Sequence, residues 1–241
     1  RGKECLGKLL RATGAAKSFH LATAGLVAAS LPVLECREQD RRGRLALSQR
    51  GAGYKQESSM EHKRVAIVTG ASRGIGAAIA KRLAADGLAV VVNYVSGEAK
   101  AQAVVRDIVA AGGHAVAIQA DVSDSGDAAE LFTAAEAVFG GVDVLVNNAG
   151  VMQPGLVPLA ETDDALFDRL VSINLRGSFN MLRLAATKLR QGGRIVNFSS
   201  SVVGLAPPGY AVYAATKAAI ETMTAIFAKE LRGRDITVTA I

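Results

Sequence analysis

The stretch "KRVAIVTGASRGIGAAIAKRLAADGLAVVVNYV", residues 63–95, contains two apolar runs separated by a glycine-rich turn and a segment of helical period. The runs "VAIV" and "LAVVVNY" are rich in β-branched residues, as in parallel strands that are buried on both faces. Between them, "AAIAKRLAADG" predicts a helix that ends at Gly87, a favourable residue for a helix C-cap. The stretch therefore predicts a strand–helix–strand unit with two parallel strands.

The turn "TGASRGIG", residues 69–76, has the glycine spacing of a dinucleotide-binding loop. Gly70 allows a tight turn off the strand, Gly74 lets the backbone approach a pyrophosphate, and Gly76 lets the helix pack close to the sheet. The helix N-terminus that follows presents free N–H groups and a partial positive charge to phosphates. Because the turn follows a strand and opens a helix, it predicts a nucleotide site rather than an unliganded turn.

The end of the second strand indicates which nucleotide is bound. Sites that prefer NAD usually carry a carboxylate about 20 residues after the loop, where it binds the ribose 2′-hydroxyl. Here this position reads Asn93-Tyr94-Val95-Ser96, without a carboxylate, although Glu98 follows closely. Arg73, inside the loop, suits a charge-assisted contact to a 2′-phosphate. The sequence thus predicts NADP(H).

Further strands follow in "AVAIQA", in "VDVLV" and in "GRIVNFSSS" (193–201), and two long helices are expected at about 172–190 and 214–231. The first of these helices belongs to a longer helical segment that we expect to begin at Thr162. Repeated strand–helix alternation predicts an α/β fold, a doubly wound (Rossmann) parallel sheet with helices on both faces. We expect it to form a single domain over residues 61–241.

Tyr213 and Lys217, in "YAATK", are four residues apart and so share one face of a helix. Taken alone, such a pair is usually an ordinary amphipathic one, with the Tyr half buried and the Lys reaching water. Free tyrosine, with a pKa of about 10, is a poor proton donor or acceptor at neutral pH, and a neighbouring ammonium favours its phenolate. The pair therefore also suits acid–base chemistry.

The order and spacing of these motifs from Lys63 to Ile241 resemble those of the short-chain dehydrogenase/reductase family. The glycine loop is followed by "DV" (121–122), "NNAG" (147–150), "INL" (173–175), the serine-ended strand and "YAATK". No single motif is decisive, but the set is specific.

The resemblance implies a role for each of four residues. Tyr213 would exchange a proton with the carbonyl oxygen while hydride is transferred, and Ser200 would donate a hydrogen bond to that oxygen. Lys217 would favour the tyrosinate and hold the nicotinamide ribose, and Asn174 would hold a water that links Lys217 to solvent. Ser200 is preferred over Ser201 because it lies six residues after Arg194 and thirteen before Tyr213, but Ser201 remains an alternative.

The resemblance also implies the full set of site residues and the substrates. The catalytic residues would be Asn174, Ser200, Tyr213 and Lys217, and the cofactor-binding residues would be Gly70, Ser72, Arg73, Gly74, Ile75, Gly76, Asn93, Tyr94, Asp121, Val122, Asn148, Ala149, Gly150, Tyr213 and Lys217. The substrate would be a small aldehyde, ketone or 3-oxoacyl compound, or the matching alcohol. No metal site is expected, because the three histidines are scattered.

The sequence ends at "DITVTAI", where the family pattern continues into a substrate lid, a helix and a last strand. We therefore expect the final edge strand and the lid to be absent. An alternative function follows: an NADP(H)-binding sensor, or a truncated family member without activity. The two long helices often pair between subunits in the family, which implies a homodimer or homotetramer.

Residues 1–60 differ from the rest in charge. They hold 11 Lys and Arg against 5 Asp and Glu, whereas residues 61–241 hold 17 of each, so the net charge of +6 resides in this segment. No aromatic residues interleave with basic ones in a patch, so nucleic acid is not an expected partner. The uncharged run at residues 18–34 contains a proline and is shorter than a bilayer span, so a membrane is not expected either. We expect a basic extension outside the fold and a cytoplasmic protein, or a plastid or mitochondrial one if the segment is a transit peptide.

Overall fold

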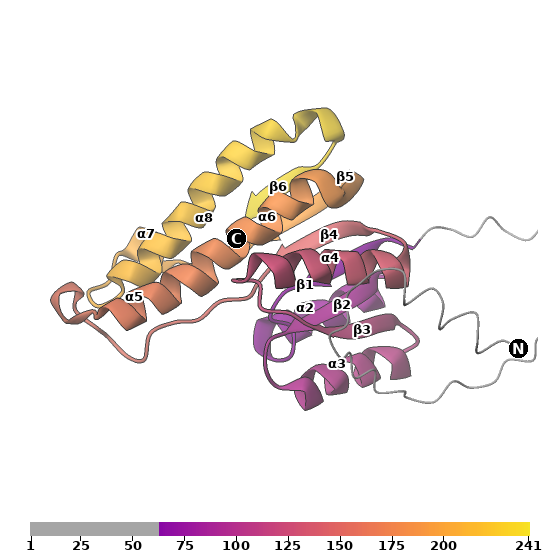
Figure 1. Cartoon of the computed structure of the whole chain (residues 1–241), viewed down its shortest axis with the longest axis horizontal. Coiled ribbons are helices and arrows are strands. Elements are labelled where there is room, and N and C mark those ends of the chain that lie inside the picture. Colours follow the sequence, from indigo (N-terminus) through magenta and orange to yellow (C-terminus); the bar gives the residue numbers. More distant parts are fainter. Residues whose placement is uncertain (1–62) are drawn as a thin grey trace, which may run out of the picture. The chain divides into compact units, whose positions relative to one another are not determined.

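The structure, a computed structural model, describes residues 63–241, so the expectations for residues 1–60 lie outside the described residues. Six strands form one sheet (Figure 1). In chain order they are β1 (Val65–Val68), β2 (Ala89–Tyr94), β3 (His114–Gln119), β4 (Val142–Asn147), β5 (Leu189–Asn197) and β6 (Thr237–Ala240). Their spatial order is β3-β2-β1-β4-β5-β6, with every neighbouring pair parallel. The predicted doubly wound parallel sheet is confirmed.

Helices cover both faces of this sheet. The longer ones are α2 (Gly74–Ala85), α3 (Glu98–Ala110), α4 (Ser125–Phe139), α6 (Gly177–Lys188) and α8 (Ala211–Glu230). Val90 and Val92 of β2 pack toward α2 and α3, whereas Val91 packs into the opposite cluster with Phe132 of α4 and Met181 of α6. Alternate residues of one strand thus enter two cores, which explains why the strand sequences are apolar throughout.

The segment that carries Asn174 differs from the single helix expected from about residue 162. A 3₁₀ turn, η1 (Leu159–Glu161), comes first, and then α5 (Asp164–Leu170) passes through a π-helical stretch, η2 (Val171–Arg176), into α6. Asp163 rather than Thr162 is the N-cap, because its carboxylate accepts from Leu166 N at 2.7 Å. The π-helical turn was not predicted, since the apolar spacing here fits an α-helix equally well.

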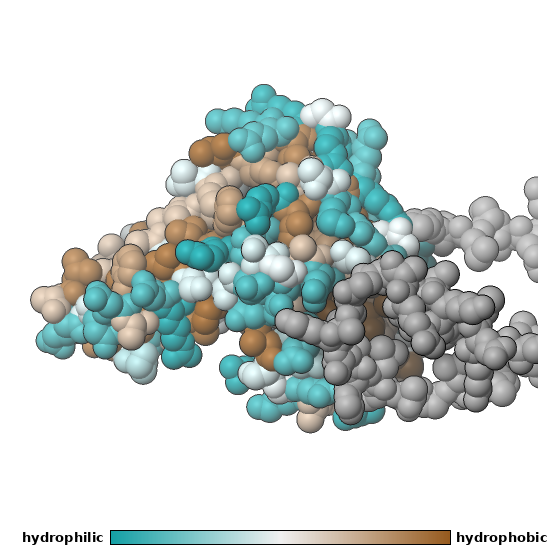
Figure 2. Space-filling view, viewed as in Figure 1, coloured by the Kyte–Doolittle hydropathy of each residue, from teal (hydrophilic) through white to brown (hydrophobic). Residues whose placement is uncertain are grey.

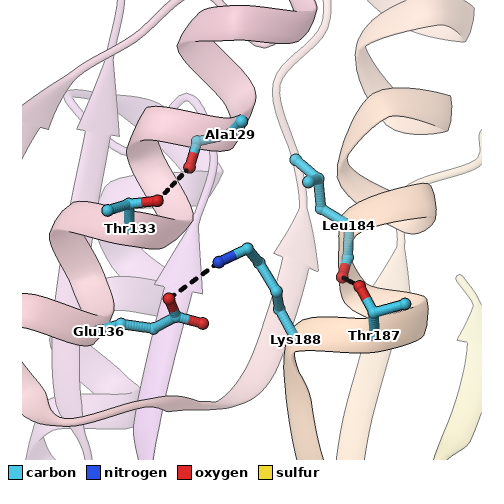
Figure 3. Close-up of polar contacts among 6 residues, drawn as sticks. All are labelled: Ala129, Thr133, Glu136, Leu184, Thr187 and Lys188. Carbon is cyan, nitrogen blue, oxygen red and sulfur yellow. Dashed lines mark hydrogen bonds and ion pairs between the residues drawn. The ribbon is translucent and has the colours of Figure 1, made fainter.

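A contact between helices ties α4 to α6 on one face of the sheet (Figure 3). Lys188 Nζ, at the end of α6, lies 2.9 Å from Glu136 Oε2 of α4. Both side chains are about one third exposed, so the pair contributes roughly 1 kcal/mol or less. The apolar contacts of Phe132 and Met181 beneath it therefore dominate the packing of these helices.

Asp143 joins three strands at the opposite end from the glycine loop. Its Oδ2 accepts from Val65 N of β1 at 2.7 Å and from Arg190 Nη1 of β5 at 3.1 Å. Strand β4, which carries Asp143, lies between β1 and β5. The carboxylate thus links the beginnings of β1 and β5 to β4.

The remaining elements are short. Helix α7 (Val202–Leu205) lies between β5 and α8, and the 3₁₀ turn η3 (Arg232–Arg234) joins α8 to β6. Among residues 63–241, no helix is both long and apolar enough to cross a bilayer.

Candidate active site

The glycine loop leaves β1 in the conformation that its sequence predicts. Gly70 has φ +62°, and a Cβ there would lie 2.9 Å from Ala149 Cα, so both backbone strain and space demand glycine. A Cβ on Gly76 would lie 2.7 Å from Gly70 O and 2.5 Å from Asn148 Nδ2. Gly76 therefore lets α2 start against the loop, with the helix N-terminus at the carboxyl edge of the sheet.

Asn148 and Thr69 join the loop to the end of β4. Asn148 Nδ2 donates to Thr69 O at 2.8 Å and to Gly70 O at 3.2 Å, while Thr69 Oγ1 accepts from the backbone N–H groups of Asn148 and Ala149. These bonds satisfy backbone groups that have left the sheet ladder. They also hold the two strand ends together where the sheet topology reverses direction, which is the place where ligands bind in doubly wound sheets.

A cavity of about 430 Å³ opens beside this junction. Nine of the predicted cofactor residues line it: Gly70, Ser72, Arg73, Tyr94, Asp121, Val122, Asn148, Ala149 and Gly150. Asp121 is the one acidic residue in the lining, and its Oδ1 accepts from Ser123 N and Ser123 Oγ. Three basic side chains, Arg73, Lys100 and Arg169, are in the same lining, so the cavity is suited to an anion.

Asn93, predicted to contact the cofactor, instead points into the protein. It is buried, and its Oδ1 accepts from Gly70 N at 3.2 Å while its Nδ2 donates to Ala120 O at 3.0 Å. Asn93 therefore positions the glycine loop from the protein interior, through its bond to Gly70 N. Gly74 and Ile75 begin α2 at its exposed end, and they and Gly76 are outside the cavity lining.

Seven lining residues were not predicted: Val95, Ser96, Gly97, Lys100, Val151, Arg169 and Ile173. Gly97 is the N-cap of α3, with φ +85°, and Lys100 Cδ lies 3.9 Å from where a Cβ on Gly97 would be. Ser96 and Lys100 could have been predicted, because they follow the end of β2 closely in the sequence. Arg169 reaches the cavity from α5, a contact between distant segments that no local pattern reveals.

Tyr213 and Lys217 lie one turn apart near the start of α8. Lys217 Nζ is 5.9 Å from the centroid of the Tyr213 ring and donates to Phe198 O, just beyond β5, at 2.7 Å. Neither residue lines the cofactor cavity, but Lys217 Nζ lies 3.7 Å from where a Cβ on Gly150 would be, and Gly150 does line it. Burial lowers the pKa of Lys217 from its ordinary value of 10.5.

Asn174 connects α8 to the segment that follows β4. It is 1% exposed and lies in the π-helical stretch, a feature frequent at functional sites. Its Oδ1 accepts from Val151 N at 2.8 Å, and its Nδ2 donates to Val151 O at 2.9 Å and to Thr216 Oγ1 at 3.3 Å. Thr216 Oγ1 in turn donates to Tyr213 O at 2.7 Å. One chain of hydrogen bonds thus runs from the segment after β4 to the backbone carbonyl of Tyr213.

The three serines after β5 face different surroundings. The predicted strand continues only to Asn197, so Ser199, Ser200 and Ser201 lie in the turn that follows. Ser199 Oγ donates to Glu221 Oε1 at 2.6 Å, Ser200 is half-buried, and Ser201 is exposed as the N-cap of α7. Within residues 63–241, no three His, Cys, Asp or Glu side chains gather as a metal site would require.

This arrangement, a doubly wound sheet with an anion-suited cavity beside its glycine loop and a Tyr–Lys pair at its edge, defines a nucleotide-binding α/β protein. The short chain dehydrogenase family model matches residues 64–241, which is most of the chain. The protein belongs to the short-chain dehydrogenase/reductase family of oxidoreductases.

Individual relatives agree with this assignment. An Arabidopsis thaliana "NADPH-dependent aldehyde reductase-like protein, chloroplastic" is 43% identical over 190 residues, covering 74% of this chain and 70% of that protein. The 3-oxoacyl-[acyl-carrier-protein] reductase of Staphylococcus aureus is 41% identical over 184 residues, or 76% of this chain and 74% of that one. A Burkholderia cenocepacia short chain dehydrogenase, solved in complex with NADP, has a TM-score of 0.70 at 43% identity, covering 74% and 72% of the two chains.

The buried Lys217 makes the stability of the fold depend on pH. Because its pKa is lower in the folded than in the unfolded chain, the unfolded state binds more protons between the two values. The free energy of unfolding should therefore rise with pH over that interval, by at most about 1.4 kcal/mol per pH unit from this group. Urea unfolding of the wild type and of Lys217→Met, at pH values up to about 10.5, would reveal the rise as a difference between the two. Parallel pH profiles would contradict it.

Proposed function

We propose that this protein transfers hydride between NADP(H) and a carbonyl or alcohol substrate. The observation that carries the proposal is the buried Lys217 ammonium beside the Tyr213 ring, close to Gly150 of the cofactor cavity. The glycine loop suits a dinucleotide. A side chain at Gly70 would strike Ala149, so the turn needs glycine there, and the open space beside Gly74 leaves room for a ligand to approach the backbone. When bound, the nicotinamide cofactor supplies or accepts the hydride.

The side chains of this chain would handle the proton and the oxygen. Tyr213 would give its proton to the carbonyl oxygen during reduction and remove it from the alcohol during oxidation. Ser200 would donate a hydrogen bond to the same oxygen and so orient it. Lys217, whose ammonium lies beside the Tyr213 ring, would hold the nicotinamide ribose, and Asn174 holds the loop after β4 against α8 through Val151 and Thr216.

Replacing the proposed proton donor tests this function. Tyr213→Phe should lower kcat by about 10²–10⁴-fold while leaving the Kd for NADPH nearly unchanged, because only the hydroxyl is removed. The matched control is Tyr210→Phe, whose ring packs edge-on against Tyr213 and which should keep most activity. Steady-state kinetics and calorimetric titration measure the two quantities. Equal turnover by wild type and Tyr213→Phe would refute the catalytic role, and cofactor binding without turnover by wild type would favour a sensor.

The preference for NADP(H) is supported by the charges around the cavity. Arg73 lies in the glycine loop and Lys100 in the first turn of α3, and both line the cavity beside Tyr94 at the end of β2. Glu98 is outside the lining, although burial of Tyr94 and, to a lesser extent, the charge of Glu98 raise the pKa of Tyr94. A 2′-phosphate would thus meet two cations. The name of the Arabidopsis relative and the bound NADP of the Burkholderia structure support the same cofactor.

Removing either of these two basic side chains should therefore weaken the binding of NADPH but not the binding of NADH. Arg73→Ala and Lys100→Ala should each raise the Kd for NADPH about 10–100-fold, as expected for loss of a hydrogen bond to a charged group. Lys81→Ala is the control, because Lys81 pairs with Asp107 on the surface, away from the lining. Titration calorimetry with both nucleotides measures the ratio. A wild type that binds NADH more tightly than NADPH would overturn the cofactor assignment.

We propose aldehydes, ketones or 3-oxoacyl compounds as the substrate range, in line with the printed names of the two relatives. The location in the cell stays a prediction, because the plastid and mitochondrial alternatives depend on residues 1–60.

We further propose that the chain forms a homodimer or homotetramer through α6 and α8, which run side by side (Figure 1). Their outer surface has a hollow of about 340 Å³ lined mainly by apolar side chains, of which Phe179 is 45% and Ile226 52% exposed. A larger hollow beside it shares Phe179 and contains Arg176 and Asp124. In a two-fold pairing, apolar residues would cover each other and opposite charges could meet.

A charge placed on this surface should separate the subunits. Ile226→Glu should convert the oligomer into a monomer, because burying the added carboxylate among the apolar residues of this surface would carry a large desolvation penalty. Val109→Glu is a suitable control, since Val109 is similarly exposed, at 55%, but lies on α3. Size-exclusion chromatography with light scattering gives the molar mass of each. A monomeric wild type, or an oligomer that survives the substitution, would contradict the proposal.

A further inference from the structure

Gln153 ties the segment after β4 to Gly209, just before α8. Its Nε2 donates to Gly209 O, which also accepts from Val157 N at 3.2 Å. Gly209 has φ +86°, and a Cβ on it would lie 2.8 Å from Leu156 Cβ, so the two segments are in close contact. We infer that Gln153 is a positioning residue: by holding Gly209 it sets where the Tyr213 hydroxyl lies relative to the cofactor cavity. This inference rests on the proposed function.

The amide of Gln153 can make this bond in one orientation only. A carbonyl oxygen accepts but cannot donate, so Nε2 must face Gly209 O and Oε1 must point away from it. Gln153 is 5% exposed, and among residues 63–241 its Oε1 has no hydrogen-bond partner. A buried acceptor without a partner is costly, so this glutamine stabilises the fold less than a fully paired one would. Its bond to Gly209 is therefore better explained by position than by stability.

The other contacts at this junction are mainly apolar. A small hollow beside Gln153 has no space for a water molecule. The apolar side chains in its lining are those of Val157, Leu166, Leu170, Ala211 and Val212. Figure 2 likewise shows brown and tan residues at the end of the molecule where α7 and the first turns of α8 lie. Apolar contacts are not directional, whereas hydrogen bonds are, so the two bonds to Gly209 O fix how the segments lie against each other.

The first turn of α8 carries the position of Gly209 to the tyrosine. Tyr210 is the N-cap of this helix, and Ala214 N donates to Tyr210 O at 2.8 Å. The Tyr213 ring packs edge-on against the Tyr210 ring, with the two centroids 6.3 Å apart. Because its backbone hydrogen bonds make a helical turn move as a unit, a displacement of Gly209 would displace both tyrosines.

The segment after β4 connects Gln153 to the cofactor cavity. Val151, two residues before Gln153, lines that cavity, and Asn174 binds both backbone groups of Val151. Asn174 also reaches α8 through Thr216, whose Oγ1 donates to Tyr213 O. Two routes therefore join the tyrosine to the cavity, one through Asn174 and one through Gln153. A misplacement of about 1 Å can lower a rate about 10²-fold, so losing one route should slow turnover.

Replacing the amide with a side chain of similar length tests the inference. Gln153→Met removes the donor and the unpaired acceptor together, while Gly209 O keeps its bond from Val157 N. With NADPH and benzaldehyde or acetoacetyl-CoA, kcat should fall about 10–100-fold. The Kd for NADPH should stay nearly unchanged, because Gln153 is outside the cavity lining. The melting temperature should change by less than about 3 °C, since removal of the unpaired acceptor offsets the lost bond. Gln191→Met, at an exposed position of β5, is the control and should keep full activity.

NMR of ring-labelled tyrosine reports the position of Tyr213 without requiring turnover. The chain has four tyrosines, so the spectrum is simple, and Tyr210→Phe and Tyr213→Phe identify two of the signals. Gln153→Met should shift these two signals, because each ring shields the other, and should leave the signal of Tyr94 in β2 unchanged. Gly209→Ala, which places a Cβ in the same contact, should shift the same two signals. The control variant should shift none.

The two measurements separate failure of this inference from failure of the proposed reaction. Shifted ring signals in Gln153→Met, with no turnover by the wild type, would retain Gln153 as the residue that positions Tyr213 and overturn the proposed reaction. Unshifted signals, or shifted signals with an unchanged kcat, would overturn the inference. A Gln153→Met variant that unfolds would also overturn it, because the bond would then serve stability.

Discussion

Backbone groups that leave the carboxyl ends of buried parallel strands lose their ladder partners, and the site of this protein is built from the side chains that replace those partners. Thr69 and Asn148 bind the backbone after β1 and β4, and Asn174 binds both backbone groups of Val151. Lys217 binds Phe198 O after β5. Each bond holds a segment that would otherwise need water, so the strand ends, the cavity beside the glycine loop and helix α8 take up fixed relative positions.

The bond from Lys217 to Phe198 O holds the lysine ammonium in a buried position, where desolvation disfavours its charge. Lys217 is 6% exposed and burial lowers its pKa, so its ammonium is maintained against the fold's own stability. Such a cost is typical of active sites, where groups are positioned for chemistry rather than for stability. The π-helical turn at Asn174 fits this pattern, because it replaces a regular α-helical turn at the residue that links Val151 to Thr216.

Charge is unevenly distributed around the site. Arg73, Lys100 and Arg169 line the cavity beside the glycine loop, whereas the segments 151–160 and 198–212, of which Val151 also lines the cavity, contain no charged residue. A phosphorylated ligand suits the three cations, since phosphates gain from charge-assisted hydrogen bonds.

The sequence alone determined the fold class, the family and the glycine loop, because these depend on local periodicity, on the steric freedom of glycine and on motif order. Tyr213 and Lys217 were readable for the same reason, since a helix brings residues four apart together. Only the tertiary structure decided that Asn93 supports the loop instead of facing the cavity, that Arg169 reaches the cavity from α5, and that the segment after β4 rests on Gly209. These outcomes depend on which distant backbone groups need a partner after the strands have assembled, and no local pattern records that need.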